Sequence, residues 1–253
     1  MYSKFMFDAS RSVSPFDILT FFEYYNYGLK NNIFKNKNKI NLKLTSCIDY
    51  QNNYIDGDKI EKELFKEIDA DVFISHSNKD KELAIAISGW LEKELGLKVF
   101  VDFCTWDCID KIIDELNNRY NIVRTEQNVS KTYEHNKANY FSSHLYLMLN
   151  SALNNMLDKT ECLLFINTEN SIIPLDTMDS PKRSSSPWIC SELVMANAMR
   201  QSLPSRYTLE KCSMEHNVSQ FKNIDFSILS KWKNSISTTE HPLDVLYKIT
   251  EDI

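Results

Sequence analysis

Two side chains capable of chemistry stand one helical turn apart in the segment SSSPWICSEL, residues 184–193. Pro187 predicts the first position of a helix and Ser186 its N-cap, so Trp188 and Glu192 share one patch of the helix surface. An aromatic ring can stack on a planar ligand, and a carboxylate can hold ribose hydroxyls and stabilise positive charge on a sugar ring. The patch is therefore either an ordinary exposed rim or a site built for a ribose.

Further polar side chains follow three predicted buried strands. Those strands are the runs DVFISHS, LKVFVD and ECLLFIN. Ligands of an open parallel sheet bind beyond the carboxyl ends of the strands, and the helix of Glu192 should open on the same rim. We expect one cleft that gathers Glu192 with the substrate-binding candidates Ser75, His76, Ser77, Asp102, Asn167 and Trp188, with Trp106 as a further aromatic candidate.

Each candidate also has a purely structural alternative. Glu192 would suit the first turns of a helix as a solvated residue, because acidic side chains complement the helix dipole there. Trp188 and Trp106 could pack as ordinary apolar residues, and Asp102 could serve a turn or a helix cap. Ser75 and His76 are adjacent, but neighbours on a strand face opposite ways, which disfavours a Ser/His hydrolase.

The elements that position these residues alternate between strand and helix. The three buried runs are typical of parallel strands, and residues 77–96 predict an amphipathic helix. Ser77 and Asp80 form a capping signal, and Gly96 suits the position just beyond the helix. Strand, helix and strand with short connections make a βαβ unit, so we expect an α/β fold with a parallel sheet flanked by helices.

The other segments complete a two-part organisation. Residues 1–68 predict an N-terminal extension packed on the core, and residues 69–253 the main domain, with 103–139 as an enlarged loop or insertion. A strong helix follows, with leucines at four-residue steps, and His144 on it is expected to be a core histidine rather than a ligand. A fourth strand is expected within 205–230, with FSILS as the candidate, before a closing helix over HPLDVLYKITEDI.

The composition excludes several classes of function. A net charge of −6 over 253 residues argues against nucleic-acid binding, which needs a basic surface. No run approaches the roughly 20 apolar residues that span a bilayer, and no signal-peptide pattern opens the sequence, so we expect a cytoplasmic protein without a membrane partner. The four glycines make no phosphate-binding loop. Cys104 and Cys108 stand alone as CxxxC and predict reduced thiols, so no metal is expected.

The stretch DVFISHSNKDKELAIAISGWLEKELGLKVFVD, followed by ECLLFIN and WICSEL, resembles Toll/interleukin-1 receptor (TIR) domains. In that family a buried strand with a Ser-rich turn, an amphipathic helix and a second strand open the domain, and the enzymatic members carry Trp-x-x-x-Glu on a later helix. The resemblance covers about residues 69–201 and implies a flavodoxin-like fold. The long segment 103–139, in the region of the BB loop, and residues 1–68 depart from the family.

The resemblance implies two alternative functions. Enzymatic TIR domains cleave NAD at the bond to nicotinamide, and some bacterial members, including Thoeris antiphage proteins, make a cyclic or related ADP-ribose messenger for a downstream effector. By that resemblance Glu192 is catalytic, NAD is a substrate rather than a cofactor, and TIR–TIR contacts build a homo-oligomer. Other members are non-catalytic protein-interaction modules. A nucleoside-processing enzyme on a related α/β fold is a third alternative.

Overall fold

The computed structural model of the chain describes residues 1–9, 18–33, 35, 38, 48–49, 54–56, 59, 68–102, 113–114, 117–118, 122–125, 131–133, 135–171, 187–200, 202–207, 221–237 and 239–251. The chain forms two compact units. The first comprises Met1–Phe34, Asp69–Asp102 and Leu157–Ile253, and the second comprises Lys35–Ile68 and Phe103–Met156.

The first unit is built on a five-stranded sheet in the order β5-β4-β8-β1-β9, and all of its strands are parallel. Each of the three buried runs predicted from the sequence forms one of these strands, which confirms the α/β class. All residues of β4 and β5 are buried, as is typical of a parallel sheet covered on both faces. The strands are β1 Ser3–Asp8, β4 Val72–Ser75, β5 Val99–Val101, β8 Cys162–Asn167 and β9 Lys222–Ile224.

The N-terminal strand lies inside the sheet, which corrects the expected extension over residues 1–68. β1 pairs with β8 along its whole length and with β9 on its other edge. Lys4 and Asp8 interrupt the apolar pattern of SKFMFD, so the sequence gives no buried run there. The pairing partners also lie far along the chain, and no local signal could reveal them. The sheet unit therefore takes in residues 1–34, and only 35–68 group with 103–156.

The strand order departs from the flavodoxin-like pattern at one place. Counted from β4, the first three strands lie in the order second, first, third, as in a flavodoxin-like sheet. The fourth place is occupied by β1 from the N-terminus, and β9 takes the fifth. From β4 the chain crosses to β5 at one edge of the sheet, and from β5 it returns past β4 to β8 on the other side. The strand order therefore reverses between β4 and β8, and open α/β sheets bind ligands at such a switch point.

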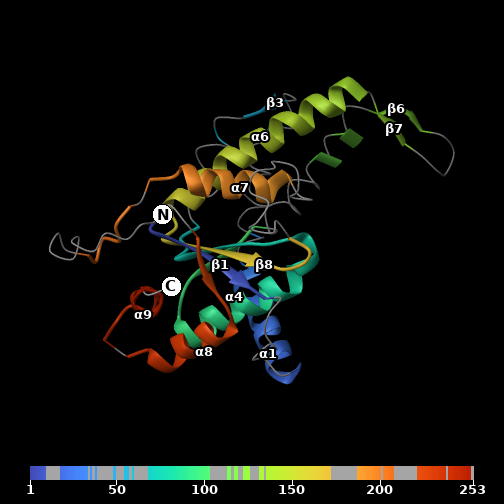
Figure 1. Ribbon diagram of the computed structural model, residues 1–253. Helices are drawn as coiled ribbons and strands as arrows, with labels where there is room; N and C mark the ends of the chain where they lie inside the picture. Colours follow the sequence, from blue (N-terminus) through green and yellow to red (C-terminus); the bar gives the residue numbers. More distant parts are fainter. Residues whose placement is uncertain are drawn as a thin grey trace. The chain divides into compact units, whose positions relative to one another are not determined.

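Side chains of β1 show how helices cover the two faces. Phe5 stacks on Tyr247 of α9 (Pro242–Ile249), and Phe7 meets Phe226 of α8 (Phe226–Ser235) edge to face. Lys4 points the other way and donates a hydrogen bond to the Ala196 carbonyl of α7 (Pro187–Ala198). Because successive strand residues face opposite sides, α7 lies on one face and α8 and α9 on the other (Figure 1).

Helices α1 (Ile18–Gly28) and α4 (Lys81–Leu95) cross with their backbones in close contact. A Cβ atom on Gly28 would lie 2.3 Å from the Ile85 carbonyl oxygen, and one on Gly89 would lie 2.0 Å from the Tyr24 carbonyl oxygen. Glycine is therefore required at both positions by the approach of the other helix. As predicted, α4 ends at Gly96, whose φ of 67° is the left-handed conformation of a helix terminus.

The C-terminal part contains a strand and two helices. The fourth strand expected within 205–230 is β9, but FSILS belongs to helix α8 and not to a strand. The Asp225 carboxylate accepts hydrogen bonds from the backbone N–H groups of Ser227 and Ile228, and this N-cap starts a helix just after β9. The predicted closing helix is α9, with Pro242 at its first position.

The second unit contributes most of a long helix and short strand pairs. Helix α6 (His135–Lys159) confirms the predicted helix, and its four stripe residues Leu145, Leu149, Leu153 and Leu157 are buried. His144 is exposed and contacts Tyr140 one turn earlier. The expectation of a core histidine is therefore wrong, because His144 lies outside the buried leucine stripe of the helix. The strand pairs are β2 (Ile48–Asp49) with β3 (Tyr54–Ile55) and β6 (Ile122–Thr125) with β7 (Lys131–Tyr133).

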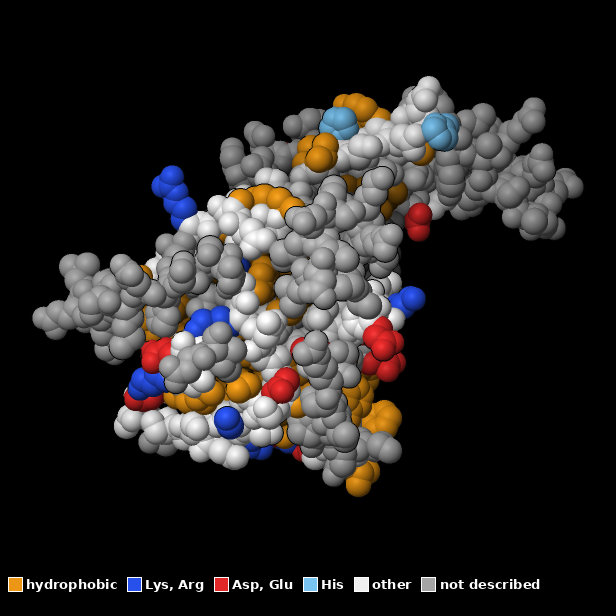
Figure 2. All heavy atoms as spheres, viewed as in Figure 1, with side chains coloured by type: hydrophobic (Ala, Val, Ile, Leu, Met, Phe, Trp, Pro, Cys, Tyr) orange, Lys and Arg blue, Asp and Glu red, His pale blue; other side chains and the backbone are white. Residues whose placement is uncertain are grey.

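The short helical turns complete the described elements: η1 (Leu29–Ile33) continues α1, and η2 (Asn78–Asp80) precedes α4. Within residues 35–68 the sequence predicts a strand at INLKLTS and a short amphipathic helix at DGDKIEKELFKEI, and the first wholly and the second almost wholly lie outside the described residues. Figure 2 shows apolar side chains at the surface over the region of α1, and Leu19 and Phe22 of this helix are exposed. None of the helices in the described part of the chain combines the length and apolarity needed to cross a membrane.

Candidate active site

Glu192 is in direct contact with the end of strand β4. The Ser75 hydroxyl donates a hydrogen bond of 2.5 Å to Glu192 Oε2. Ser75 is fully buried and Glu192 is 3% exposed, so the contact is shielded from water. Ser75 is the last residue of β4, which adjoins β8 at the switch point. The carboxylate therefore lies at the edge where this kind of sheet binds ligands.

The direction of α7 explains how its sixth residue reaches that edge. Lys4, near the amino end of β1, holds the carbonyl of Ala196 near the C-terminus of α7. The N-terminal half of α7 therefore extends towards the carboxyl ends of the strands. Ile189, Glu192 and Ala196 form the buried stripe of the helix, because residues three and four apart share one face.

A second buried carboxylate, that of Asp102, lies at the end of the strand next to Ser75. His76 Nδ1 lies 2.7 Å from Asp102 Oδ1, and both side chains are nearly fully buried. The contact is electrostatic, since the two atoms are close but lack hydrogen-bond geometry. His76 follows β4 and Asp102 follows β5, so adjacent strand ends bring the two residues together.

The surroundings of Glu192 favour its neutral form. Burial raises the pKa of Glu192 well above its ordinary value, the negative charge of Asp102 raises it further, and the hydrogen bond from Ser75 opposes both effects. Burial disfavours the charged form because the carboxylate loses its hydration. Within the part of the chain that the structure describes, no group donates a hydrogen bond to the buried atoms Glu192 Oε1 and Asp102 Oδ1, and buried polar atoms of this kind are rare in folded proteins.

The remaining predicted site residues divide into two groups. Ser77 is buried and its hydroxyl accepts from the Lys79 N–H, so it caps η2. Asn167 ends β8 at the same sheet edge, and its carbonyl accepts from the Ala9 N–H. Trp188 lies on α7, but its side chain, like the whole of Trp106, lies outside the described residues.

Sequence reasoning missed a group of residues beside the site. The sequence predicts that Asp80 forms a capping signal with Ser77. Its carboxylate instead accepts from the Thr168 hydroxyl at 2.5 Å and the Asn170 amide at 2.7 Å. These hydrogen bonds tie the turn after β4 to the turn after β8. The available signal was positional, because Asp80 and Thr168 both follow strands that end at the same edge.

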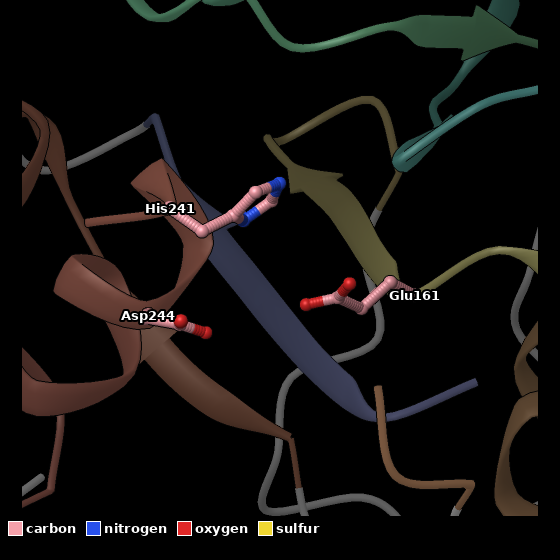
Figure 3. A group of neighbouring side chains, drawn as sticks. All are labelled: Glu161, His241 and Asp244. Atoms are coloured by element: carbon pink, nitrogen blue, oxygen red, sulfur yellow. The ribbon is translucent and has the colours of Figure 1, made fainter. Parts of the chain in front are cut away.

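A separate cluster of ionisable side chains lies near the opposite, amino end of β8. Ligand atoms of Glu161, His241 and Asp244 lie within 4.8 Å of one another, and Figure 3 shows the three side chains converging from the start of β8 and of α9. The Arg206 guanidinium, however, donates to both carboxylates, at 2.6 and 2.7 Å to Glu161 and at 2.5 to 3.0 Å to Asp244. Tyr207 and Tyr247 donate to the same acids. A guanidinium already compensates the charge that would attract a cation, so the cluster is structural.

Replacing Arg206 with methionine is expected to destabilise the protein by about 2 kcal/mol, because it leaves two half-buried carboxylates uncompensated; the partial exposure of the cluster limits the effect. Lys98→Met is the matched control, since it breaks an exposed ion pair with Asp69 and should destabilise the protein much less than Arg206→Met. Urea unfolding at pH 7 measures both changes. Equal losses in the two variants would contradict the structural role of the cluster.

The difference in stability between wild type and Arg206→Met should also depend on pH. Burial would raise the pKa of Asp244, but hydrogen bonds from Arg206 and Tyr207 outweigh it and lower the pKa. A group whose folded-state pKa is lowered stabilises the fold above its unfolded pKa and loses that contribution as the pH falls through the folded pKa. Wild type and Arg206→Met should therefore converge in acid.

Comparisons of the chain with protein-family models, curated proteins and solved structures found no match. The class of protein is therefore given by the fold and the site alone. It is an α/β protein with a parallel sheet that buries a serine–carboxylate contact at its switch point.

Proposed function

We propose that the protein is a TIR-type NAD glycohydrolase or cyclase and that Glu192 is its catalytic residue. The observation that carries the proposal is the buried contact of Glu192 with Ser75 at the switch point of the sheet. The order of the strands β4, β5 and β8, followed by a helix that carries Trp188 and Glu192, agrees with the resemblance drawn from the sequence.

The reaction breaks the bond between ribose C1′ and the nicotinamide nitrogen. The electron pair of that bond leaves with nicotinamide, which is neutral after departure and needs no general acid. Positive charge develops on the ribose ring, as in other glycosyl transfers. The Glu192 carboxylate stabilises that charge and accepts hydrogen bonds from the ribose hydroxyls. Attack by water gives ADP-ribose, and attack by the adenine ring gives a cyclic product.

The burial of Glu192 favours the enzyme over a non-catalytic interaction module. A module binds its partner through exposed residues, whereas Glu192 is 3% exposed and one of its oxygens receives no hydrogen bond from the described residues. An unsatisfied buried carboxylate costs stability, and such costs are typical of catalytic sites. The ribose hydroxyls would supply the missing donors.

The resemblance to TIR domains also suggests the product of the reaction and its cellular role. The product would be an ADP-ribose-derived messenger in bacterial antiphage defence, read by a downstream effector, and the active form would be a homo-oligomer held by TIR–TIR contacts. Mass spectrometry of the product identifies the linear or cyclic form.

The proposal is tested by NAD binding and NAD cleavage in the same preparation. NAD should raise the melting temperature, because a ligand that binds only the folded state stabilises it, and nicotinamide should be released. Glu82→Gln, which changes an exposed acid at the start of α4, is the control for the substitution at position 192 and should behave as wild type. The proposal would be refuted if NAD produced no thermal shift and no nicotinamide were released, both with and without infected-cell extract as a trigger.

A further inference from the structure

Two polar contacts attach helix α7 to the sheet, and they lie one helical turn apart. Near the middle of the helix, Glu192 accepts the hydrogen bond from Ser75 at the end of β4. One turn later, the Ala196 carbonyl accepts a hydrogen bond of 3.0 Å from Lys4 Nζ of β1, and the Asn197 side-chain oxygen lies 3.4 Å from the same nitrogen. Since β8 separates β1 from β4, the two contacts hold the helix to two different strands.

Lys4 is unusual because its amine is buried among neutral groups. The residue is 4% exposed, and lysine is seldom buried to this extent unless it is paired with a charge. Its partners among the described residues are a carbonyl, a side-chain amide and the ring of Phe221, whose centroid lies 5.7 Å from Nζ. Carbonyls near a helix C-terminus lack intrahelical partners and favour a nearby cation. The amine therefore fastens the C-terminal end of α7 to β1.

Apolar packing alone gives α7 little to fix its rotation. Within the described side chains of this helix, only Ile189, Glu192 and Ala196 are buried, and Val194 is 60% exposed. A helix with so narrow an apolar stripe can turn about its axis at little cost in buried area. A change of register by one residue turns a side chain by about 100°, which would take Glu192 away from Ser75.

We propose that Lys4 is a positioning residue, which fixes the register of α7 so that the Glu192 carboxylate meets Ser75. The inference rests on the proposed function, because the position of Glu192 matters for catalysis only if Glu192 acts on a substrate. The attachment of α7 by Lys4 does not itself require NAD, so it can be measured separately.

Lys4→Met tests the inference, since it keeps a long side chain and removes the amine. Lys222→Met is the comparison variant: Lys222 of β9 donates to the Thr250 carbonyl at the C-terminal end of α9, a helix that carries no site residue. Amide hydrogen exchange is measured on the full-length protein without NAD. In Lys4→Met it should become about tenfold faster in α7, the scale of a lost hydrogen bond to a charged group, and stay unchanged in α9. Lys222→Met should show the reverse.

Faster exchange confined to α7 would support the inference. Unchanged exchange in α7, or an equal increase throughout the sheet unit, would overturn it, because Lys4 would then not hold this helix in particular. If Lys4→Met fails to fold, Lys4→Gln replaces it under the same criterion. The neutral amide of glutamine ends one atom short of the lysine amine and should lose the contact with Ala196.

Kinetics separate this inference from the proposed function. In Lys4→Met the kcat of nicotinamide release should fall by roughly tenfold to a hundredfold, the scale of misplacing a reacting group by about 1 Å, with KM largely unchanged. Lys222→Met should keep the wild-type kcat even if it melts at a lower temperature. A normal kcat in Lys4→Met would reject the role of Lys4 and retain the enzyme. Selective exchange in α7 without NAD cleavage by wild type would retain the attachment and reject the enzymatic proposal.

Discussion

Glu192→Gln should lose NAD cleavage by roughly a thousandfold, the scale of removing a preorganised charge-stabilising group from an active site. The amide keeps the shape of the side chain and can still accept the Ser75 hydrogen bond, but it carries no negative charge for the ribose ring. The loss should appear in the rate of nicotinamide release at saturating NAD, with binding of NAD largely retained.

The same substitution should stabilise the folded protein at neutral pH. The pKa of Glu192 is raised in the folded state, first by burial and then by Asp102. A carboxyl with a raised folded pKa destabilises the fold as the pH rises from its unfolded pKa through its folded pKa. The amide is free of this cost. Glu192→Gln should therefore melt at a higher temperature than wild type at pH 8, and the difference should vanish towards pH 4.

The two effects together distinguish a catalytic acid from a structural one. A structural role predicts a lower melting temperature for Glu192→Gln and no selective loss of turnover. Glu82→Gln should change neither quantity, because Glu82 is exposed at the start of α4. A less stable Glu192→Gln with normal cleavage would contradict the assignment.

The second large effect is expected from Gly89→Ala. Helix propensity alone would make this change stabilising by about 0.5–1 kcal/mol. The added Cβ, however, would lie 2.0 Å from the Tyr24 carbonyl oxygen and 2.7 Å from the Gly28 amide nitrogen. Both are backbone atoms, so relief requires α1 and α4 to separate. The clash outweighs the gain in helix propensity, so we expect Gly89→Ala to lower the free energy of unfolding by about 3 kcal/mol or more. This loss should be seen as a fall in melting temperature of about 10 °C.

Gly28→Ala should have the reciprocal effect, since its Cβ would meet Ile85 and Gly89 of α4. Gly96→Asn is the control: nothing lies within 4 Å of its Cβ, and asparagine tolerates the left-handed conformation at a helix end. Thermal unfolding should show a loss below about 1 kcal/mol for Gly96→Asn. A stabilised Gly89→Ala variant would show that the helices do not approach as described.

The elements that could be predicted are those whose signals are local. The strands β4, β5 and β8 are continuous apolar runs, helix α4 has a four-residue apolar stripe, and Gly96 marks its end. The placing of Ser75, Asp102 and Glu192 at one sheet edge followed from this order alone, because parallel strands end on the same side.

The elements that could not be predicted depend on distant or competing contacts. Strand β1 is defined by its pairing with β8 and β9, and its polar residues hide it in the sequence. FSILS has the composition of a strand, but the Asp225 cap starts a helix at that point. Arg206 joins Glu161 and Asp244 from three separate segments, and no spacing rule links such residues. The spacing of Ser77 and Asp80 predicts a cap, but the hydrogen-bond partners of the Asp80 side chain lie after β8.

The most direct measurement is a crystal structure of the Glu192→Gln variant with NAD bound. We expect the nicotinamide ribose to lie at the carboxyl ends of β4 and β8, with its hydroxyls within hydrogen-bond distance of the side chain at position 192 and close to Ser75. A dinucleotide bound at another edge of the sheet, or a ribose out of reach of position 192, would contradict it.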